Sequence, residues 1–226
     1  AVGYGEYQDR SFDGRNSRTG GYEVIEEVDL PEKAEESGKE ALKLLTAKNC
    51  PEMTTDVIVG GSQLALQVHE STGHPMELDR ALGAEAAYAG TSFLTVDKLD
   101  KFRYGSKEVT IVADATIPSG LGTFGYDDEG VPAQRVYLVK EGIFVNYISD
   151  RTFAGELGLP STGAARASGW NRIPLVRMTN INLEPGTWGF DELVKETKSG
   201  IYMETNRSWS IDDKRLNFQF GTQIAY

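Results

Sequence analysis

The chain has 226 residues, with 34 acidic and 23 basic side chains that give a formal net charge of −11. Its apolar fraction is 39%, and no run approaches the roughly 18 apolar residues that a membrane span requires. An acidic surface also repels phosphate backbones. We therefore expect a globular protein that has neither a membrane nor a nucleic acid as its partner.

Cys50 is the single cysteine, so the chain cannot form an internal disulfide. The first residues, Ala1 to Gly5, have neither the basic start nor the apolar stretch of a secretory signal. Both features favour a cytoplasmic location. Because the chain lacks an initiator methionine and ends inside a predicted strand, we expect a fragment of a longer protein.

The sequence up to residue 50 predicts an irregular segment over 1–21, a short strand over 22–28 and an amphipathic helix over 31–46. This helix has Pro31 at its start and lysines near its end, as the helix dipole favours. The residues at 49–52 break the helix and mark a candidate domain boundary.

Beyond that boundary we predict a buried strand over 56–60, a helix over 62–73 capped by Ser62, and a second helix over 78–88. The remainder alternates apolar and polar residues between Gly-, Pro- and Asp-rich turns, which is typical of strands. Predicted elements there are strands at 109–113, 135–139, 144–148, 175–179, 201–204 and 217–220, a hairpin turn at Glu141-Gly142 and a short helix at 191–197. The expected class is α+β, with a metal-binding helix packed on a curved, mostly antiparallel β-sheet.

The chain's only two histidines lie in the segment His69-Glu70-Ser71-Thr72-Gly73-His74. A catalytic zinc site needs about three protein ligands, an open position for water and a carboxylate that accepts a proton from that water. His69 and His74 are therefore candidate zinc ligands, and Glu70 is the candidate general base. Because only neutral imidazole binds a metal, affinity is expected to fall below about pH 6.5. The alternative is that all three are ordinary residues at a helix end.

The spacing of the two histidines requires a distorted helix. In a regular α-helix, residues i and i+5 lie ~140° apart and therefore on different faces. We expect a π-type or loosened turn that brings His74 back to the face of His69. Gly73 tolerates unusual backbone angles, and Pro75 is expected to force His74 out of the α region.

The sequence contains no convincing third ligand. Cys50 is a weak candidate, because Pro51 and a predicted strand separate it from the motif, and the alternative is a buried small side chain. Glu77 and Glu85 are within reach, and we interpret both as support for the ligands or as solvent-facing charge.

Three further patterns carry less weight. Residues 126–130 predict a turn rather than a calcium loop, because they lack the alternation and distal Glu of an EF-hand. Residues 120–125 resemble a phosphate-binding loop only superficially, and we interpret their glycines as backbone flexibility beside a cleft. Arg166, Arg172 and Arg177 either bind a peptide carboxylate or backbone, or are surface charge.

Three long segments resemble the TldD/PmbA family of metallopeptidases, specifically its TldD branch. They are HESTGHPMELDRALGAEAAYAGTSF at 69–93, GTFGYDDEGVPAQRVYLVKEGIF at 122–144 and RASGWNRIPLVRMTNINLEPG at 166–186. The resemblance implies a zinc peptidase that cleaves unfolded or extended peptides inside a cavity, with His69 and His74 as ligands and Glu70 as the catalytic residue. It also implies a third ligand, a cysteine located beyond Tyr226, so this chain by itself is expected to bind zinc weakly and to lack activity.

The same resemblance implies a domain organisation and an assembly. Residues 1–50 would be the tail of an N-terminal α/β domain, and residues 51–226 a β-rich metallopeptidase domain truncated at its C-terminus. Family members form homodimers or heterodimers with a paralogous subunit that lacks the metal motif, so this chain resembles the catalytic partner.

The leading functional hypothesis is a zinc-dependent peptidase acting on flexible peptides. A non-catalytic assembly module that contributes a dimer interface is the alternative from another class. A metal-dependent hydrolase of small amides differs from the first hypothesis only in substrate. Cobalt, manganese or iron could replace zinc, because nitrogen ligands discriminate poorly among these metals.

Overall fold

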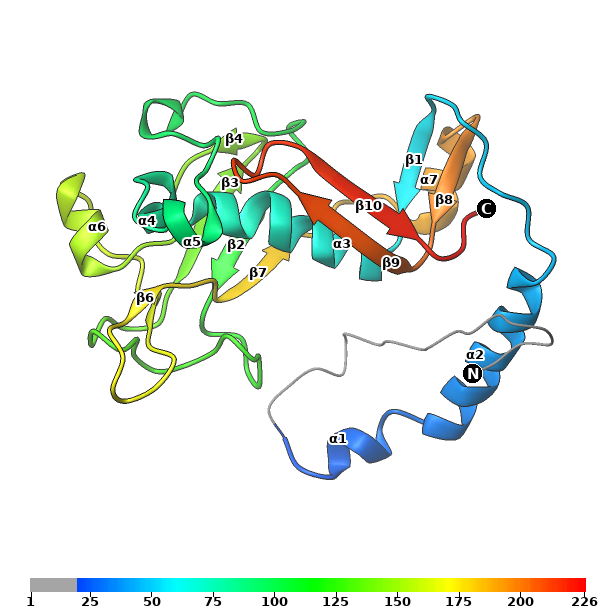
Figure 1. Ribbon diagram of the computed structural model, residues 1–226, viewed down its shortest axis with the longest axis horizontal. Coiled ribbons are helices and arrows are strands. Elements are labelled where there is room, and N and C mark those ends of the chain that lie inside the picture. The colour runs from blue at the N-terminus through cyan, green and yellow to red at the C-terminus, as the bar shows by residue number, and fades with distance from the viewer. Residues whose placement is uncertain (1–19) are drawn as a thin grey trace.

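A computed structural model describes residues 20–226, and Figure 1 shows how its elements are arranged. Helices α1 (Glu23–Glu26) and α2 (Leu30–Leu44) come first in the chain and lie apart from the strands in this view. The Asp29 side chain caps α2 by accepting a hydrogen bond from the Glu32 amide at 3.1 Å. The predicted helix is confirmed, and the expectation for residues 1–19 lies outside the described residues.

The short strand predicted over 22–28 is wrong, because this segment forms α1. The amides of Glu26 and Glu27 bond to the carbonyls of Tyr22 and Glu23, so one helical turn satisfies its own backbone. A strand would instead need a neighbouring strand to pair with.

A four-stranded antiparallel sheet, in the order β4-β3-β2-β7, lies at the centre of the domain. Its strands are β2 (Ile111–Asp114), β3 (Arg135–Lys140), β4 (Ile143–Phe144) and β7 (Asn180–Leu183). Every residue of the inner strand β2 is buried, whereas β7 is an edge strand. The predicted hairpin turn between β3 and β4 is confirmed, and both turn residues have positive φ, 48° at Glu141 and 80° at Gly142.

Helix α3 (Gly61–Val68) and the turns that follow it pack beside this sheet (Figure 1). The chain after β4 holds them in place, because the Leu78 amide bonds to the Ile148 carbonyl at 2.9 Å and the Ile148 amide to the Met76 carbonyl at 2.7 Å. One core joins both layers, with members Val68, Met76, Leu78, Leu94, Ile111, Ala113, Leu138, Val139, Phe144, Tyr147, Ile148, Ala164 and Val176. This α+β arrangement confirms the predicted class.

The other strands form three two-stranded sheets. They are the parallel pair β1 (Asp56–Val59) and β8 (Gly200–Met203), the antiparallel pair β5 (Ala165–Arg166) and β6 (Leu175–Val176), and the antiparallel hairpin β9 (Asn206–Ile211) and β10 (Phe218–Thr222). The prediction that residues 56–60 form a buried strand is wrong as to burial, because Val57 is 43% exposed on this small pair. Strand β9 was not predicted, since its residues include Asn, Arg and two Ser and carry little apolar signal.

Three predicted elements are shorter in the structure. The helix expected over 78–88 is divided into α4 (Leu78–Ala81) and α5 (Ala86–Ala89), because the amides of Gly83 and Ala84 turn back to the carbonyls of Arg80 and Asp79. The strand expected over 175–179 stops at Val176 and resumes as β7, and the strand expected over 144–148 ends at Phe144. The remaining helices are the 3-10 turn η4 (Val96–Lys98), α6 (Arg151–Glu156) and α7 (Phe190–Glu196), the last close to its prediction.

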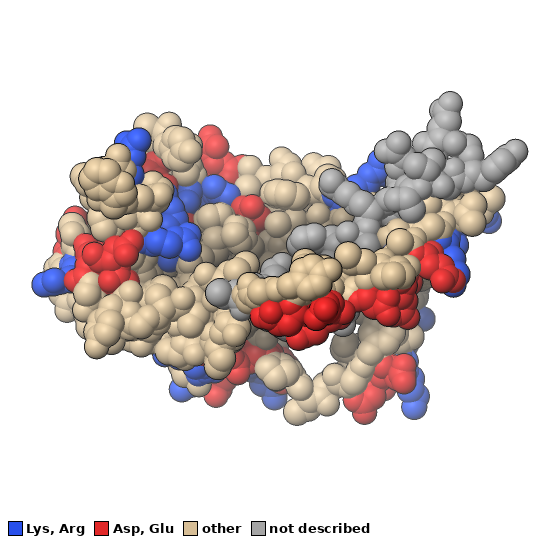
Figure 2. Space-filling view, turned by 90° about the horizontal axis from the view of Figure 1, so that it is seen from below, with Lys and Arg blue, Asp and Glu red and all other residues tan. Residues whose placement is uncertain are grey.

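The surface and helix lengths bear on the expected partners. No helix in residues 20–226 is both long and apolar enough to cross a bilayer. On the face shown in Figure 2, acidic side chains form patches and the basic side chains of the described residues stand in small separate groups. This view shows no continuous basic area among the described residues.

Candidate metal centre

The chain between His69 and Gly73 forms a π-helical turn, η2, directly after α3. The His74 amide bonds to the His69 carbonyl, five residues back, which is the bond that defines a π-turn. The wider turn brings the two imidazoles together, with ring centroids 4.7 Å apart and ring planes at 87°. The π-type turn predicted from the spacing is confirmed.

The backbone of His74 differs from the prediction. His74 stays in the α region, with φ −62° and ψ −42°, and the 3-10 turn η3 (His74–Met76) continues the helix through Pro75. A proline ring in an α-helix clashes with the carbonyl four residues earlier, here that of Ser71, and provides no N–H for it. In this turn the Ser71 carbonyl accepts a hydrogen bond from the Tyr104 hydroxyl at 2.7 Å instead.

Tyr104 therefore supplies the bond that Pro75 cannot make. Its hydroxyl also lies 2.8 Å from that of Thr72. Because the Tyr104 proton is directed to the Ser71 carbonyl, the Thr72 hydroxyl donates to the Tyr104 oxygen. Burial raises the pKa of Tyr104, which keeps this donor protonated.

Gly73 has a role other than the one predicted. Its backbone is ordinary α, with φ −57° and ψ −62°. A Cβ at this position would overlap the sulfur of Met178, which packs against the turn. Gly73 therefore leaves room for the Met178 side chain, and its backbone angles are not unusual.

A buried ion pair stands behind His74. Its Nδ1 lies 2.9 Å from Oε2 of Glu77, whose side chain has no exposure to solvent. Arg80, only 3% exposed, donates to the same oxygen from Nε at 3.1 Å and from Nη2 at 2.8 Å. A carboxylate on Nδ1 fixes the tautomer in which the other nitrogen, Nε2, is free to bind a metal. Glu77 therefore contacts the candidate ligand His74, and the alternative of solvent-facing charge is wrong.

The pKa shifts of His69 and Glu77 favour metal binding. His69 is partly exposed, yet desolvation of its ring lowers its pKa, the neighbouring His74 lowers it further, and the nearby carboxylates offset only part of this effect. Burial opposes ionisation of Glu77, yet its hydrogen bonds to His74 and Arg80 outweigh this effect and lower its pKa. His69 is thus neutral at neutral pH and Glu77 is ionised, as a ligand and its support must be.

Glu70 completes a cluster with the two histidines. One ligand atom from each of His69, Glu70 and His74 lies within 4.8 Å of the others. The Glu70 side chain is 11% exposed, and its Oε2 accepts a hydrogen bond from Nη1 of Arg215 at 2.9 Å. Two imidazoles beside a carboxylate are a donor set that suits zinc.

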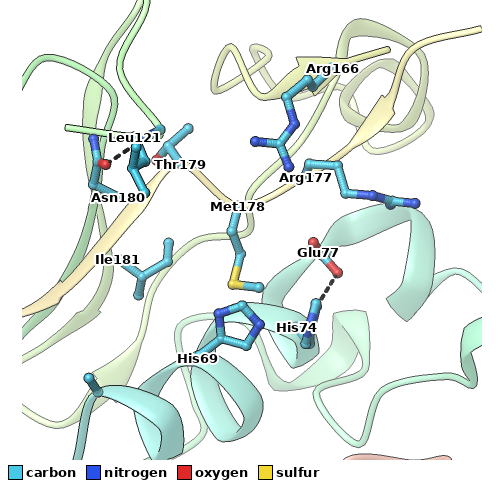
Figure 3. Close-up of a pocket in the computed structure, with 12 residues that line it drawn as sticks. His69, His74, Glu77, Leu121, Arg166, Arg177, Met178, Thr179, Asn180 and Ile181 are labelled. Atoms are coloured by element: carbon cyan, nitrogen blue, oxygen red, sulfur yellow. Dashed lines mark hydrogen bonds and ion pairs between the residues drawn. The ribbon is translucent and has the colours of Figure 1, made fainter. Parts of the chain in front are cut away.

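The two histidines of the cluster line a pocket of about 440 Å³. Figure 3 shows His69 and His74 together on one wall, with Met178 above them and Arg166 and Arg177 on the opposite side. The edge strand β7 and the segment before it provide much of the lining, which consists of Ala65, His69, His74, Glu77, Leu121, Gly122, Arg166, Arg177, Met178, Thr179, Asn180 and Ile181. The glycine-rich segment 120–125 thus borders the pocket, as predicted.

Two of the three arginines named in the sequence analysis lie at the pocket. Arg166 and Arg177 line the pocket, whereas Arg172 is exposed and is not among its lining residues. Arg177 donates to Glu85 at 3.4 Å and lies 4.0 Å from Asp79. Glu85 therefore belongs to the buried charges around the pocket and does not face solvent.

Other sequence interpretations can be compared with the structure. Cys50 is exposed, so the reading of a buried side chain is wrong, and it is not part of the cluster formed by the described residues. Ser62 does not cap α3, whose cap position is Gly60; its hydroxyl instead donates to the Glu204 carbonyl at 3.2 Å. Residues 126–130 form the predicted turn, and the buried Asp127 carboxylate accepts hydrogen bonds from backbone amides.

Sequence reasoning missed Tyr104, Arg80 and Arg215. Each lies outside the six-residue motif in the sequence and is brought next to it by the fold. Arg215, for example, is 145 positions from Glu70. The signal available for Arg80 was its place on the same short helical stretch as Glu77, three residues away. No local pattern marks Tyr104 or Arg215.

Comparison with known proteins gives consistent similarities. The profile of the PmbA/TldA metallopeptidase C-terminal domain matches residues 52–226. A metalloprotease of Methanocaldococcus jannaschii is 37% identical over 211 residues, which is 92% of this chain and 45% of that protein. A zinc metalloprotease TldD homolog of Saccharolobus solfataricus is 27% identical over 175 residues, or 75% of this chain and 36% of that protein.

A solved structure shares the fold. TldE of Thermococcus kodakarensis superposes with a TM-score of 0.71 at 18% identity, covering 88% of this chain and 43% of that one. The chain thus spans less than half the length of these relatives. The division predicted at residue 50 stays a prediction.

Replacing Tyr104 by Phe tests the support of the π-turn. The change leaves the part-buried Ser71 carbonyl and the Thr72 hydroxyl without their partner, so we expect the free energy of unfolding to fall by about 1–3 kcal/mol. Chemical denaturation measures this fall. The same change at Tyr88, which is 89% exposed, is the control. Equal stability of the Tyr104→Phe variant and the wild type would show that the hydroxyl does not support the turn.

Asp79 gives a prediction of pH dependence. Burial raises its pKa from 3.8 to about 6, although a backbone hydrogen bond from Arg80 works against this. The folded state therefore holds this proton more tightly than the unfolded state, and the wild type loses stability as the pH rises through this interval. We expect the free energy of unfolding of Asp79→Asn to rise relative to that of the wild type between about pH 4 and about pH 6. Denaturation at several pH values measures this difference. Asp191→Asn, at an exposed residue, is the control. A difference in the free energy of unfolding between wild type and Asp79→Asn that does not vary with pH would contradict this prediction.

Proposed function

We propose that this chain, which belongs to the PmbA/TldD family of metallopeptidases, carries the zinc site and the general base of a peptidase that hydrolyses flexible peptides. The observation that carries the proposal is the convergence of His69, Glu70 and His74 at the π-turn, with a buried carboxylate behind His74. The relatives named metalloproteases support the same reaction class.

His69 and His74 would hold the zinc ion. Zinc, when bound, supplies a Lewis acid for the peptide carbonyl and lowers the pKa of water. Glu77 keeps the His74 tautomer fixed, and Arg80 holds Glu77 in place. A third protein ligand is expected from outside the described residues.

Glu70 would move the proton. Its carboxylate accepts a proton from the water whose oxygen attacks the carbonyl carbon, and the proton then passes to the amine nitrogen as the C–N bond breaks. Its low exposure limits competing contact with bulk water. A charge-assisted hydrogen bond from Arg215 holds the Glu70 carboxylate beside the histidines.

Extended peptides fit the surroundings of the cluster. The edge strand β7 and residues 178–181 run along the pocket and offer a sheet edge to which a peptide strand can pair. Arg166 lines the same pocket and can bind a peptide carboxylate through its planar guanidinium. A folded substrate does not expose a free strand in this way, so unfolded peptides are the expected class. Pairing with a second subunit, identical or paralogous, stays a prediction.

Replacing Glu70 by Gln tests the proposal in the protein as the cell makes it, loaded with zinc. We expect turnover of unstructured peptides to fall at least about 100-fold, because a general base contributes roughly 10²–10⁴ to the rate. Zinc content should not change, since both histidines remain.

Glu108→Gln, at an exposed residue paired with Lys107, is the matched control and should keep full turnover. Unchanged turnover in Glu70→Gln would remove Glu70 from the reaction. Absence of any peptide hydrolysis in the zinc-loaded wild type would favour the assembly module instead.

A further inference from the structure

Arg215 links the tip of the β9–β10 hairpin to the metal motif. Its Nη1 donates to Oε2 of Glu70 at 2.9 Å, and its Nη2 donates to the Ala89 carbonyl at 3.1 Å. The Glu70 and Arg215 side chains are only 11% and 14% exposed, so solvent screens this charge-assisted bond weakly. The carboxylate of Glu70 is therefore held from one side by a guanidinium that is itself anchored.

The hairpin tip is built to hold this arginine in place. The Asp212 carboxylate accepts hydrogen bonds from the amides of Leu216 and Asn217 and from the Asn217 side chain at 2.6–3.3 Å. Arg215 has φ 61°, in the left-handed region that few non-glycine residues adopt. Such a conformation persists only where the surrounding contacts determine it, and it is concentrated at functional sites.

The hairpin tip, residues 212–217, packs closely against the residues that follow α5. The Thr91 amide donates to the Asp213 carbonyl at 2.7 Å. Gly90 has φ 80°, and a Cβ there would overlap the same Asp213 carbonyl. A side chain at residue 90 would therefore push the tip, and Arg215 with it, away from the site.

The Ala89 carbonyl binds both arginines that contact the motif, Arg80 and Arg215. It accepts a hydrogen bond from Arg215, which holds Glu70, and another from Nη1 of Arg80 at 2.5 Å. Arg80 in turn holds Glu77 behind His74. One backbone oxygen thus aligns the arginine behind the proposed base with the arginine behind a proposed ligand.

We propose that Arg215 is a positioning residue, which orients the Glu70 carboxylate for proton transfer. The proposal rests on the proposed peptidase function. Arg215 occupies Oε2 and leaves Oε1 to accept the proton, so the carboxylate is presented in one orientation. Arg215 acts through Glu70, and misplacement of a reacting group by about 1 Å can cost roughly 10²-fold in rate.

The test compares Arg215→Met with Arg207→Met in the zinc-loaded protein as the cell makes it. Arg207 lies exposed on the same hairpin, so the control removes an arginine without touching Glu70. For Arg215→Met we expect kcat to fall by about tenfold or more, with KM and zinc content unchanged. Added guanidinium, and separately the Arg215→Lys variant, should restore part of kcat, because each returns a cation to Glu70 Oε2. If Arg215→Met does not fold, Arg215→Lys and Gly90→Ala, which displaces the tip, carry the same kinetic comparison.

A second readout does not depend on activity. In metal-free protein, denaturation of Glu70→Gln, Arg215→Met and the double variant should show that the double change shifts the unfolding midpoint by less than the sum of the single shifts. Additive shifts would overturn the proposal, because the two side chains would then not act together.

The kinetic outcomes separate this proposal from the proposed function. If Glu70→Gln abolishes turnover while Arg215→Met keeps kcat, or loses kcat only together with its zinc, the positioning role is wrong and the peptidase stands. If the wild type and Glu70→Gln are equally inactive with zinc bound, the peptidase proposal fails and the positioning role fails with it.

Discussion

The widened turn between His69 and Gly73 is the constraint on which the site depends. Two histidines five residues apart lie on different faces of an α-helix, and only a turn of this kind brings their rings to 4.7 Å. A π-turn replaces regular i to i+4 hydrogen bonds, so other parts of the fold must bond to the backbone carbonyls that lose their partners. Tyr104 does this for the Ser71 carbonyl, and the close approach of Met178 to Gly73 keeps the turn packed against the pocket.

Buried charge follows from that turn. A histidine that is to bind a metal through Nε2 needs a partner on Nδ1, and Glu77 meets this need at the cost of placing a carboxylate out of reach of solvent. Arg80 then compensates Glu77, and Arg215 plays the same part for Glu70. Buried ion pairs contribute little net stability, so their concentration around two imidazoles is better explained by function than by folding.

The sequence predicted the π-turn and the convergence of the motif residues, because spacing and helix geometry are local properties. It also predicted the α+β class and most strands of the central sheet, whose apolar alternation is strong. It failed where the outcome depends on distant residues: Tyr104 makes the bond that Pro75 cannot, so His74 stays helical. Arg215 was missed because nothing near it in the sequence marks Glu70 as its partner, and β9 because its residues carry little apolar signal.

The central claim is that the π-turn joins His69 and His74 into one metal site. The most direct measurement is the zinc content, by elemental analysis after dialysis, of the wild-type protein as the cell makes it and of His69→Ala and His74→Ala. The account predicts stoichiometric zinc in the wild type and its loss in each variant. Stoichiometric zinc that survives either change, or a wild type that binds none, would contradict it.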